Sequence, residues 1–312
     1  MMLPKDKKLC SATLPPDVLR NLPENVLDDI LIRVPLRDAV RTSILSKKWR
    51  YNWCRLPELT LDQTLWDSTN QSIPFVTRFT DIIYHLLVLH VGPITKFILS
   101  DIANLGNYSK IDNLVLFLSR NVVPSPEAGQ HYFTKYFESF PTLEHLHLDY
   151  HSLQFLAAGS GDIEAKLSSP LNYLKCLCLS YICLDELAEL SPALCLIRCS
   201  PYLQDIQIKI EYVALNKLRF PVPDDVVNEI PSSFSDVTLN HLRSVKFEGI
   251  TGKKTEMELV KLLLAKSPML VRMLIQPDIE NGSAETRLKV LTEITKFPRA
   301  SPKAEVDYNS GV

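Results

Sequence analysis

The stretch LKCLCLSYICLDELAELSPALCLIRCSPYLQDIQI, Leu174 to Ile208, contains one short pattern twice, at its beginning and at its end. In LKCLCL and in LQDIQI an apolar residue is followed by two variable residues, an apolar residue, one variable residue and an apolar residue. Successive side chains of a β-strand point to opposite faces, so the apolar positions would turn inward and the variable ones outward. The segment between the two copies, Cys183 to Cys199, is helix-like. The stretch therefore predicts a strand, a helix and a second strand.

The same pattern recurs along most of the chain. Its six copies are ITKFIL (Ile94 to Leu99), LEHLHL (Leu143 to Leu148), LKCLCL (Leu174 to Leu179), LQDIQI (Leu203 to Ile208), LRSVKF (Leu242 to Phe247) and LVRMLI (Leu270 to Ile275). The central copies lie about 30 residues apart, near the period of leucine-rich repeats. We therefore predict an α/β fold in which parallel strands stack into a short, irregular, curved solenoid. The uneven spacing leaves an ordinary α/β domain with scattered strands as the alternative.

The variable positions of these copies would form a ladder on the outer, concave face of the sheet. We predict that this face binds a target protein through a mixed set of charged, polar and apolar side chains, namely Ile98, His147, Cys178, Asp205, Lys246 and Leu274. A simple solvated face without a partner is the alternative.

Composition excludes several classes of protein. The net charge is −2 over 312 residues, so no general positive field is present to attract a nucleic acid. The N-terminal residues have no apolar core of the signal-peptide kind, and the longest apolar run, Ile82 to Val91, is too short to span a membrane. Seven cysteines, an odd number with irregular spacing, fit a reducing compartment. We expect a protein of the nucleus or cytoplasm, or both.

The N-terminal region, residues 17–62, reads as short helices divided by prolines. Pro23 suits the start of a first helix, whose apolar residues recur with helical spacing up to Val34. Pro35 ends that helix and opens a second one, Leu36 to Ile44.

A third helix is predicted from the N-cap Ser46 through Leu56. Trp49 and Trp53 would share one of its faces because they are four residues apart. Three short helices cannot bury this much apolar surface among themselves, which indicates a partner.

The stretch LPENVLDDILIRVPLRDAVRTSILSKKWRYNW, residues 22–53, resembles an F-box over the whole motif. The resemblance implies docking on the small adaptor subunit of SCF ubiquitin ligases and, through it, association with cullin. The positions implied for adaptor binding are Leu22, Pro23, Ile30, Leu31, Leu45 and Trp49. A helix-turn-helix or an ordinary small helical bundle is the alternative.

The C-terminal segment contains a strand, a helix and a strand. Thr255 followed by Glu258 predicts a capping box that opens the helix. This segment, extending through FPRASPKAEVDY (Phe297 to Tyr308), resembles the FBD domain of plant F-box/LRR-repeat proteins. The predicted organisation is a disordered tail (1–16), an F-box (17–62), irregular leucine-rich repeats (90–235) and an FBD-like unit (236–312).

One region departs from the repeat pattern. Residues 110–140 contain the turn-like VVPSPEAGQHYF, Val122 to Phe133, where family members would continue into further repeats. The solenoid is therefore expected to be short, with repeats missing between residues 120 and 140, and Val122 to Phe133 is expected to be a loose loop.

Two clusters resemble chemical sites without matching one. HLHLDYH gathers His145, His147, Asp149 and His151 and approaches the metal-binding HxHxDH motif of metallo-β-lactamase-like hydrolases, but its last histidine is displaced by one residue. The cysteines between Cys176 and Cys199 lack paired CxxC spacing. No phosphate-binding glycine loop and no GxSxG motif is present. We therefore expect no metal, no cofactor and no catalytic residues.

These features together predict a non-catalytic substrate receptor. In this hypothesis the F-box docks on the SCF adaptor, the repeats bind a target, and other subunits transfer ubiquitin; neither nucleic acid nor membrane is a partner. A repeat scaffold with a silent F-box is the alternative from another class.

Overall fold

The computed structural model describes residues 22–62, 90–100, 140–157, 169–211, 222–279 and 283–309, together with residues 65, 82, 86, 89 and 167. The chain divides into two compact units, Met1–Trp53 and Cys54–Val312, and each is described by itself. The predicted tail (1–16) and the predicted loop from Val122 to Phe133 lie outside the described residues.

The first unit contains short helices that begin at prolines. Its elements are α1 (Glu24–Ile32), α2 (Leu36–Arg41) and the 3₁₀ helix η2 (Thr42–Ile44). Pro23 and Pro35 directly precede α1 and α2, because a proline has no N–H to leave unbonded at a helix start. Leu27 and Leu31, one turn apart on α1, are fully buried. The first two predicted helices are therefore present, and the second ends as a 3₁₀ turn.

The predicted third helix, Ser46 to Leu56, is wrong. Residues 47–51 form turns, and only the 3₁₀ helix η3 (Asn52–Arg55) follows. The carbonyl of Arg50 accepts a hydrogen bond from the Ser43 hydroxyl (2.8 Å) instead of serving a helical ladder. A helix this short depends on tertiary packing, so such outside contacts decide its conformation.

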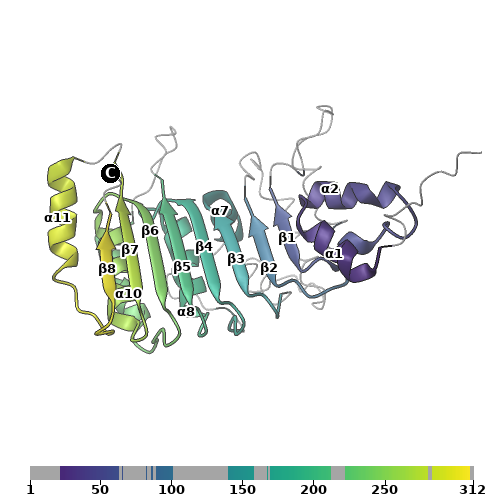
Figure 1. The fold of residues 1–312 in the computed structure, drawn as a ribbon. Helices are drawn as coiled ribbons and strands as arrows, with labels where there is room; N and C mark the ends of the chain where they lie inside the picture. The colour runs from purple at the N-terminus through teal and green to yellow at the C-terminus, as the bar shows by residue number, and fades with distance from the viewer. Residues whose placement is uncertain are drawn as a thin grey trace, which may run out of the picture. The chain divides into compact units, whose positions relative to one another are not determined.

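The second unit is built on one parallel sheet of eight strands, which lie side by side in chain order (Figure 1). The strands are β1 (Glu58–Leu61), β2 (Lys96–Leu99), β3 (His145–Asp149), β4 (Cys176–Ile182), β5 (Asp205–Ile210), β6 (Ser244–Ile250), β7 (Arg272–Pro277) and β8 (Glu305–Tyr308). All six strands predicted from the repeated pattern are present as β2 to β7. The two edge strands, β1 and β8, were not predicted.

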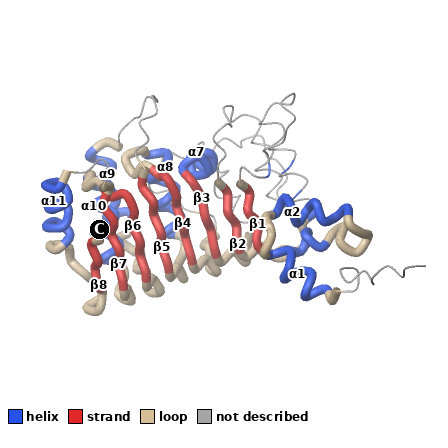
Figure 2. The backbone as a smooth tube through the Cα atoms, turned by 45° about the horizontal axis from the view of Figure 1, so that its top comes forward, coloured by secondary structure: helices blue, strands red, loops and turns tan. Residues whose placement is uncertain are grey.

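Two apolar rows on one face of this sheet form the core. One row runs from Phe97 on β2 to Met273 on β7, and the second runs from Leu99 to Ile275. Helices α8 and α10 lie behind this face of the sheet (Figures 1 and 2). The helices of this unit whose bounds lie in the described residues include α7 (Tyr150–Ala157), α8 (Leu187–Arg198), α9 (Asp224–Ser233), α10 (Lys254–Lys266) and α11 (Ala284–Ile294). The predicted α/β class and the parallel sheet are confirmed.

A tight turn introduces each of the strands β3 to β8. The first and fourth residues of the turn are buried and joined by a backbone hydrogen bond, as between Leu203 N–H and the Ser200 carbonyl (3.2 Å). The carbonyl just before each strand then accepts two N–H groups of the next one: that of Lys175 accepts from Gln204 and Asp205 (2.8 and 3.0 Å). The same bonding pattern from β2 to β7 fixes one register across the sheet.

The start of α10 differs from the predicted capping box. The helix begins at Lys254, and its third residue is Glu256 rather than Glu258. The buried Glu256 carboxylate accepts backbone N–H groups of Thr251 and Gly252 (both 2.8 Å) and the Thr251 hydroxyl (2.9 Å). A buried carboxylate therefore joins the end of β6 to the helix, where the sequence predicted a threonine cap.

Candidate protein-binding surfaces

The face of the sheet opposite the helices carries the predicted ladder. The strand register places the side chains of its middle row at matching positions on six neighbouring strands: Ile98, His147, Cys178, Gln207, Lys246 and Leu274. Five of the six residues predicted for target binding are therefore in one row. The sixth, Asp205, lies one step lower, in register with Cys176 and Ser244.

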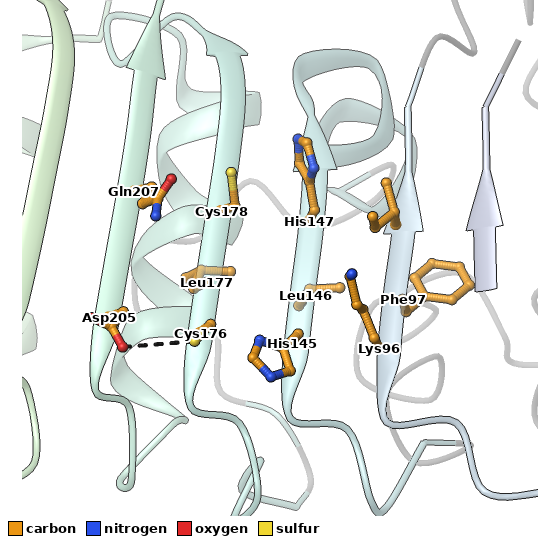
Figure 3. A pocket seen from close by; sticks show the side chains of 11 residues that line it. Lys96, Phe97, His145, Leu146, His147, Cys176, Leu177, Cys178, Asp205 and Gln207 are labelled. Carbon is orange, nitrogen blue, oxygen red and sulfur yellow. Dashed lines mark hydrogen bonds between the residues drawn. The ribbon is translucent and has the colours of Figure 1, made fainter. Parts of the chain in front are cut away.

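An open groove of about 180 Å³ runs over this face between β2 and β5 (Figure 3). Its outward side chains are Lys96, Ile98, His145, His147, Cys176, Cys178, Asp205 and Gln207. His147 Nε2 is 2.6 Å from the Ser180 hydroxyl, and the Cys176 thiol is 3.8 Å from the Asp205 carboxylate. The floor of the groove is thus a mixed polar and thiol surface.

Two lysines of the outer face are paired with carboxylates, one on either side of the groove. Lys96 bonds Glu58 at 2.8 Å, and Lys246 bonds Glu248 at 2.5 Å. These two lysines attract phosphate groups weakly, because the neighbouring anions cancel much of their field. The face is better suited to a protein than to a polyanion.

The thiols of the groove are not activated nucleophiles. Burial raises the pKa of Cys176, and the negative charge of Asp205 raises it further. Burial also raises the pKa of Cys178. Both thiols are therefore protonated at neutral pH, whereas a nucleophilic cysteine needs a lowered pKa.

The motif HLHLDYH does not converge on one point. His145 and His147 point outward from β3, but Asp149 is buried and accepts hydrogen bonds from the backbone N–H (2.8 Å) and hydroxyl (2.5 Å) of Ser152. His151 lies on α7, which begins directly after the strand. Within the described residues no group of three or more histidine, cysteine or acidic side chains is arranged to hold a metal ion.

The residues predicted for adaptor binding divide between the surface and the core of the first unit. Pro23, Ile30 and Leu45 are exposed and Leu22 is half-buried. Leu31 and Trp49 are buried, Trp49 with 4% of its surface exposed, so in this structure they stabilise the unit itself.

Sequence reasoning missed the most exposed large apolar residue among the described residues of the unit. Ile44 is 87% exposed and directly precedes Leu45, which is 59% exposed. Ile32 and Tyr51 are also exposed. Ile44 closes the predicted second helix, and its exposure depends on how the helices pack, which the sequence alone does not give. Exposed apolar residues at this density in a small unit are typical of a binding surface.

In the described part of the chain, no helix combines the length and the hydropathy needed to cross a bilayer.

Comparison with known protein families accounts for both ends of the chain. The F-box domain family model matches residues 19–60, and the FBD family model matches residues 230–275. The first match covers α1 and α2, and the second covers β6, α10 and most of β7.

Several proteins of Arabidopsis thaliana are similar to this chain. An F-box/FBD/LRR-repeat protein is 23% identical over 414 aligned positions, which cover 93% of this chain and 98% of the relative. This alignment is longer than the present chain, so many positions of the relative have no counterpart in it. An FBD-associated F-box protein is 44% identical over 63 residues, 20% of this chain and 14% of the relative. A second F-box/FBD/LRR-repeat protein is 40% identical over 78 residues, 25% of this chain and 18% of the relative.

These matches confirm the resemblance drawn from the sequence, and no enzyme family appears among them. The chain thus matches the F-box and FBD family models and is similar to F-box/FBD/LRR-repeat proteins of Arabidopsis thaliana.

Proposed function

We propose that this protein is the substrate-recognition subunit of an SCF-type ubiquitin ligase. Its F-box docks on the SCF adaptor and thereby on cullin, and the outer face of its sheet binds the target protein. The F-box match at residues 19–60 is the observation that carries this proposal. The domain limits 17–62, 90–235 and 236–312 are part of the same proposal.

The adaptor-binding half is supported by the surface of the first unit. An F-box presents apolar side chains to its adaptor, and Ile30, Ile44 and Leu45 are exposed here. Leu31 and Trp49 act behind this surface by holding the helices in place. We therefore include Leu22, Pro23, Ile30 and Leu45 from the sequence prediction, add Ile44, and assign Leu31 and Trp49 an indirect role.

The target-binding half is supported by the order of the sheet. Parallel strands in chain order, of which β3 to β8 are each introduced by the same kind of turn, are what a leucine-rich-repeat solenoid requires. We propose that β1 to β8 form such a solenoid and that β6, α10 and β7 are its FBD-like βαβ unit. The longer relative supports the view that this solenoid has fewer repeats.

The mechanism is proximity. Neither surface contains a reactive group, since the outer-face thiols are protonated at neutral pH. A target bound to the sheet would be held near a ubiquitin-charged enzyme on the same complex, which raises the effective concentration of its lysines. This role places the protein in the nucleus or cytoplasm, where the ligase works.

The proposal is tested by capturing tagged protein from plant extract and measuring adaptor and cullin by mass spectrometry. We expect both to co-purify with the wild-type chain and with Leu274→Asp, whose substitution is on the outer face. The double variant Ile44→Asp/Leu45→Asp should lose them by about tenfold or more, because a charge would face an apolar pocket.

Leu288→Asp on α11 is the matched control, since Leu288 is also exposed and apolar. It should retain both subunits. Adaptor and cullin absent from every capture, or equally present with the double variant, would contradict the proposal and leave a repeat scaffold with a silent F-box.

A further inference from the structure

The turns before four neighbouring strands place one exposed side chain each at the same edge of the sheet. Tyr173, Tyr202, His241 and Met269 each lie three residues before β4, β5, β6 and β7, so the strand register aligns them. We call these four residues the turn row. It is the edge at the tails of the strand arrows in Figure 1.

The turn geometry forces these side chains outward. In the turn from Ser200 to Leu203 the first and last residues are buried, and Tyr202 projects from between them. Tyr173, Tyr202 and Met269 are 57%, 50% and 54% exposed. Single exposed apolar residues are ordinary, but an aligned row on consecutive strands forms a patch.

The turn row is ordered by contacts between its own members. The rings of Tyr202 and His241 lie 4.9 Å apart at an angle of 37°. Rings that already contact each other lose little side-chain freedom when a ligand binds, so such a pair suits the centre of a binding surface.

The neighbouring positions give this edge of the sheet a positive charge. The residues two places further along each turn are Lys175, Gln204, Arg243 and Val271, so neither row contains a carboxylate. Lys175 is bonded to Glu144 at 2.8 Å, at the end of the row. Arg243 is exposed near its centre, directly after the turn that carries His241. An exposed guanidinium beside aromatic rings favours a carboxylate flanked by apolar side chains.

We propose that the turn row and Arg243 bind an acidic, hydrophobic segment of a partner protein. This surface is distinct from the outer face of the sheet, so the inference does not depend on the role proposed above. Four strands about 4.8 Å apart give a row about 14 Å long. An extended segment of about five residues covers that length.

The test uses a fluorescein-labelled peptide of about ten residues in which aspartate alternates with leucine. Its fluorescence anisotropy is titrated with the full-length chain. We expect binding that weakens with added salt, and no binding when lysine replaces aspartate or serine replaces leucine in the peptide. Arg243→Glu and Tyr202→Ser should each weaken binding by about tenfold.

Lys289→Glu is the matched charge control, because Lys289 is an exposed residue on α11. It should leave binding unchanged, and circular dichroism should show all three variants folded. Equal binding of the lysine peptide, or equal effects of Lys289→Glu and Arg243→Glu, would overturn the proposal. Tighter binding of a single-stranded oligonucleotide, lost in Tyr202→Ser, would also overturn it, since bases can stack on the same rings.

Discussion

At the scale of single residues, the position of Cys176 shows how one neighbour sets a chemical property. Its thiol lies in the same row as His145 and Asp205, on strands on either side. Burial is the first reason that its pKa is raised, and the Asp205 carboxylate is the second. A substitution can separate the two contributions to the pKa. Asparagine in place of Asp205 has nearly the same volume but no charge, so it removes the carboxylate's contribution and leaves the burial of Cys176 unchanged.

Asp205→Asn should therefore lower the pKa of Cys176. Removing a negative charge favours the thiolate, so the thiolate fraction at any pH below the pKa rises and alkylation becomes faster. The measurement is the pH profile of iodoacetamide modification, followed for each cysteine by peptide mass spectrometry. In the wild-type chain the Cys176 profile should rise at higher pH than that of a free cysteine.

Cys178 is the internal control. Its pKa is raised mainly by burial, and Asp205 is not among the causes. Its profile should stay in place in the variant. An unchanged Cys176 profile, or a parallel shift of both cysteines, would show that the carboxylate does not act on this thiol.

The sequence predicted which residues face outward but not what they contact. Alternation along a strand fixes the face, so Ile98, His147 and Cys178 were assigned correctly to the outer one. Alternation carries no information on pairing, and the hydrogen bond of His147 to Ser180 depends on the register between two strands. Burial was equally hidden: the F-box resemblance implied that Trp49 takes part in adaptor binding, and nothing in the sequence indicated that the structure buries this side chain.

At the scale of elements, two strands interrupt the regular sheet at the same level. β4 contains one residue more than the facing segment of β5, and β6 contains one more than the facing segment of β7; both have a positive φ there, Tyr181 at 60° and Gly249 at 79°. A bulge of this kind takes glycine readily and other residues at a cost. Tyr181 gains a compensating contact, because the Lys209 ammonium lies 4.2 Å from the centre of its ring.

Substitution at the two bulges should change the free energy of unfolding by different amounts. Gly249→Ala should lower the free energy of unfolding by about 2 kcal/mol or more, because φ is positive. Its added methyl carbon would also lie 2.4 Å from the Ile210 carbonyl oxygen. Tyr181→Gly should change it by less than about 1 kcal/mol, since relief of the backbone is offset by the lost cation–π contact and the freer unfolded chain.

Urea denaturation monitored by circular dichroism measures both effects. Equal losses for the two variants would mean that the bulges tolerate side chains equally, which would contradict the role of φ. A loss for Tyr181→Gly alone would show that the ring, rather than the backbone, stabilises this level of the sheet.

Sequence reasoning missed the two edge strands, one because it was assigned to the F-box-like stretch and the other because its copy of the repeated pattern is shortened. LPELTL, residues 56–61, fits the strand pattern and forms β1, but it directly follows the F-box-like stretch and was assigned to it. AEVDY, residues 304–308, lacks the leading leucine because β8 is an edge strand with one neighbour and less surface to bury. The prediction of a third helix was wrong for the opposite reason. Ser46 to Leu56 has helical spacing, but the Arg50 carbonyl accepts its hydrogen bond from the Ser43 hydroxyl, which lies outside the predicted helix.

At the scale of the whole molecule, the division into two units predicts that damage stays local. Trp49 belongs to the first unit and is almost fully buried. Trp49→Ala should lower the stability of that unit by about 3 to 5 kcal/mol, as is usual for a buried aromatic side chain. Hydrogen exchange should then speed up in residues 24–53 while strands β5 to β7 keep their protection.

Loss of adaptor binding in this variant would follow from unfolding and would say nothing about contact. For that reason the exposed pair Ile44 and Leu45 tests docking, whereas Trp49 tests the integrity of the unit. Faster exchange spread evenly over both units would contradict the division. The exposure of Ile44 could not be read from the sequence, because it depends on how α1 and α2 pack.

The order of the eight strands makes length an adjustable property of this fold. Among the described residues, each strand bonds only to the strands before and after it in the chain. If one strand and its helix were removed, the strands on either side would become neighbours. Within β3 to β8 both would be introduced by the same turn, and the carbonyl before one strand could accept the N–H groups at the start of the other. Such a protein can lose or gain units during evolution without redesigning the remainder, as the longer Arabidopsis relative illustrates. The outer face, proposed above to bind the target, then changes in extent while the F-box and FBD segments of the chain are kept.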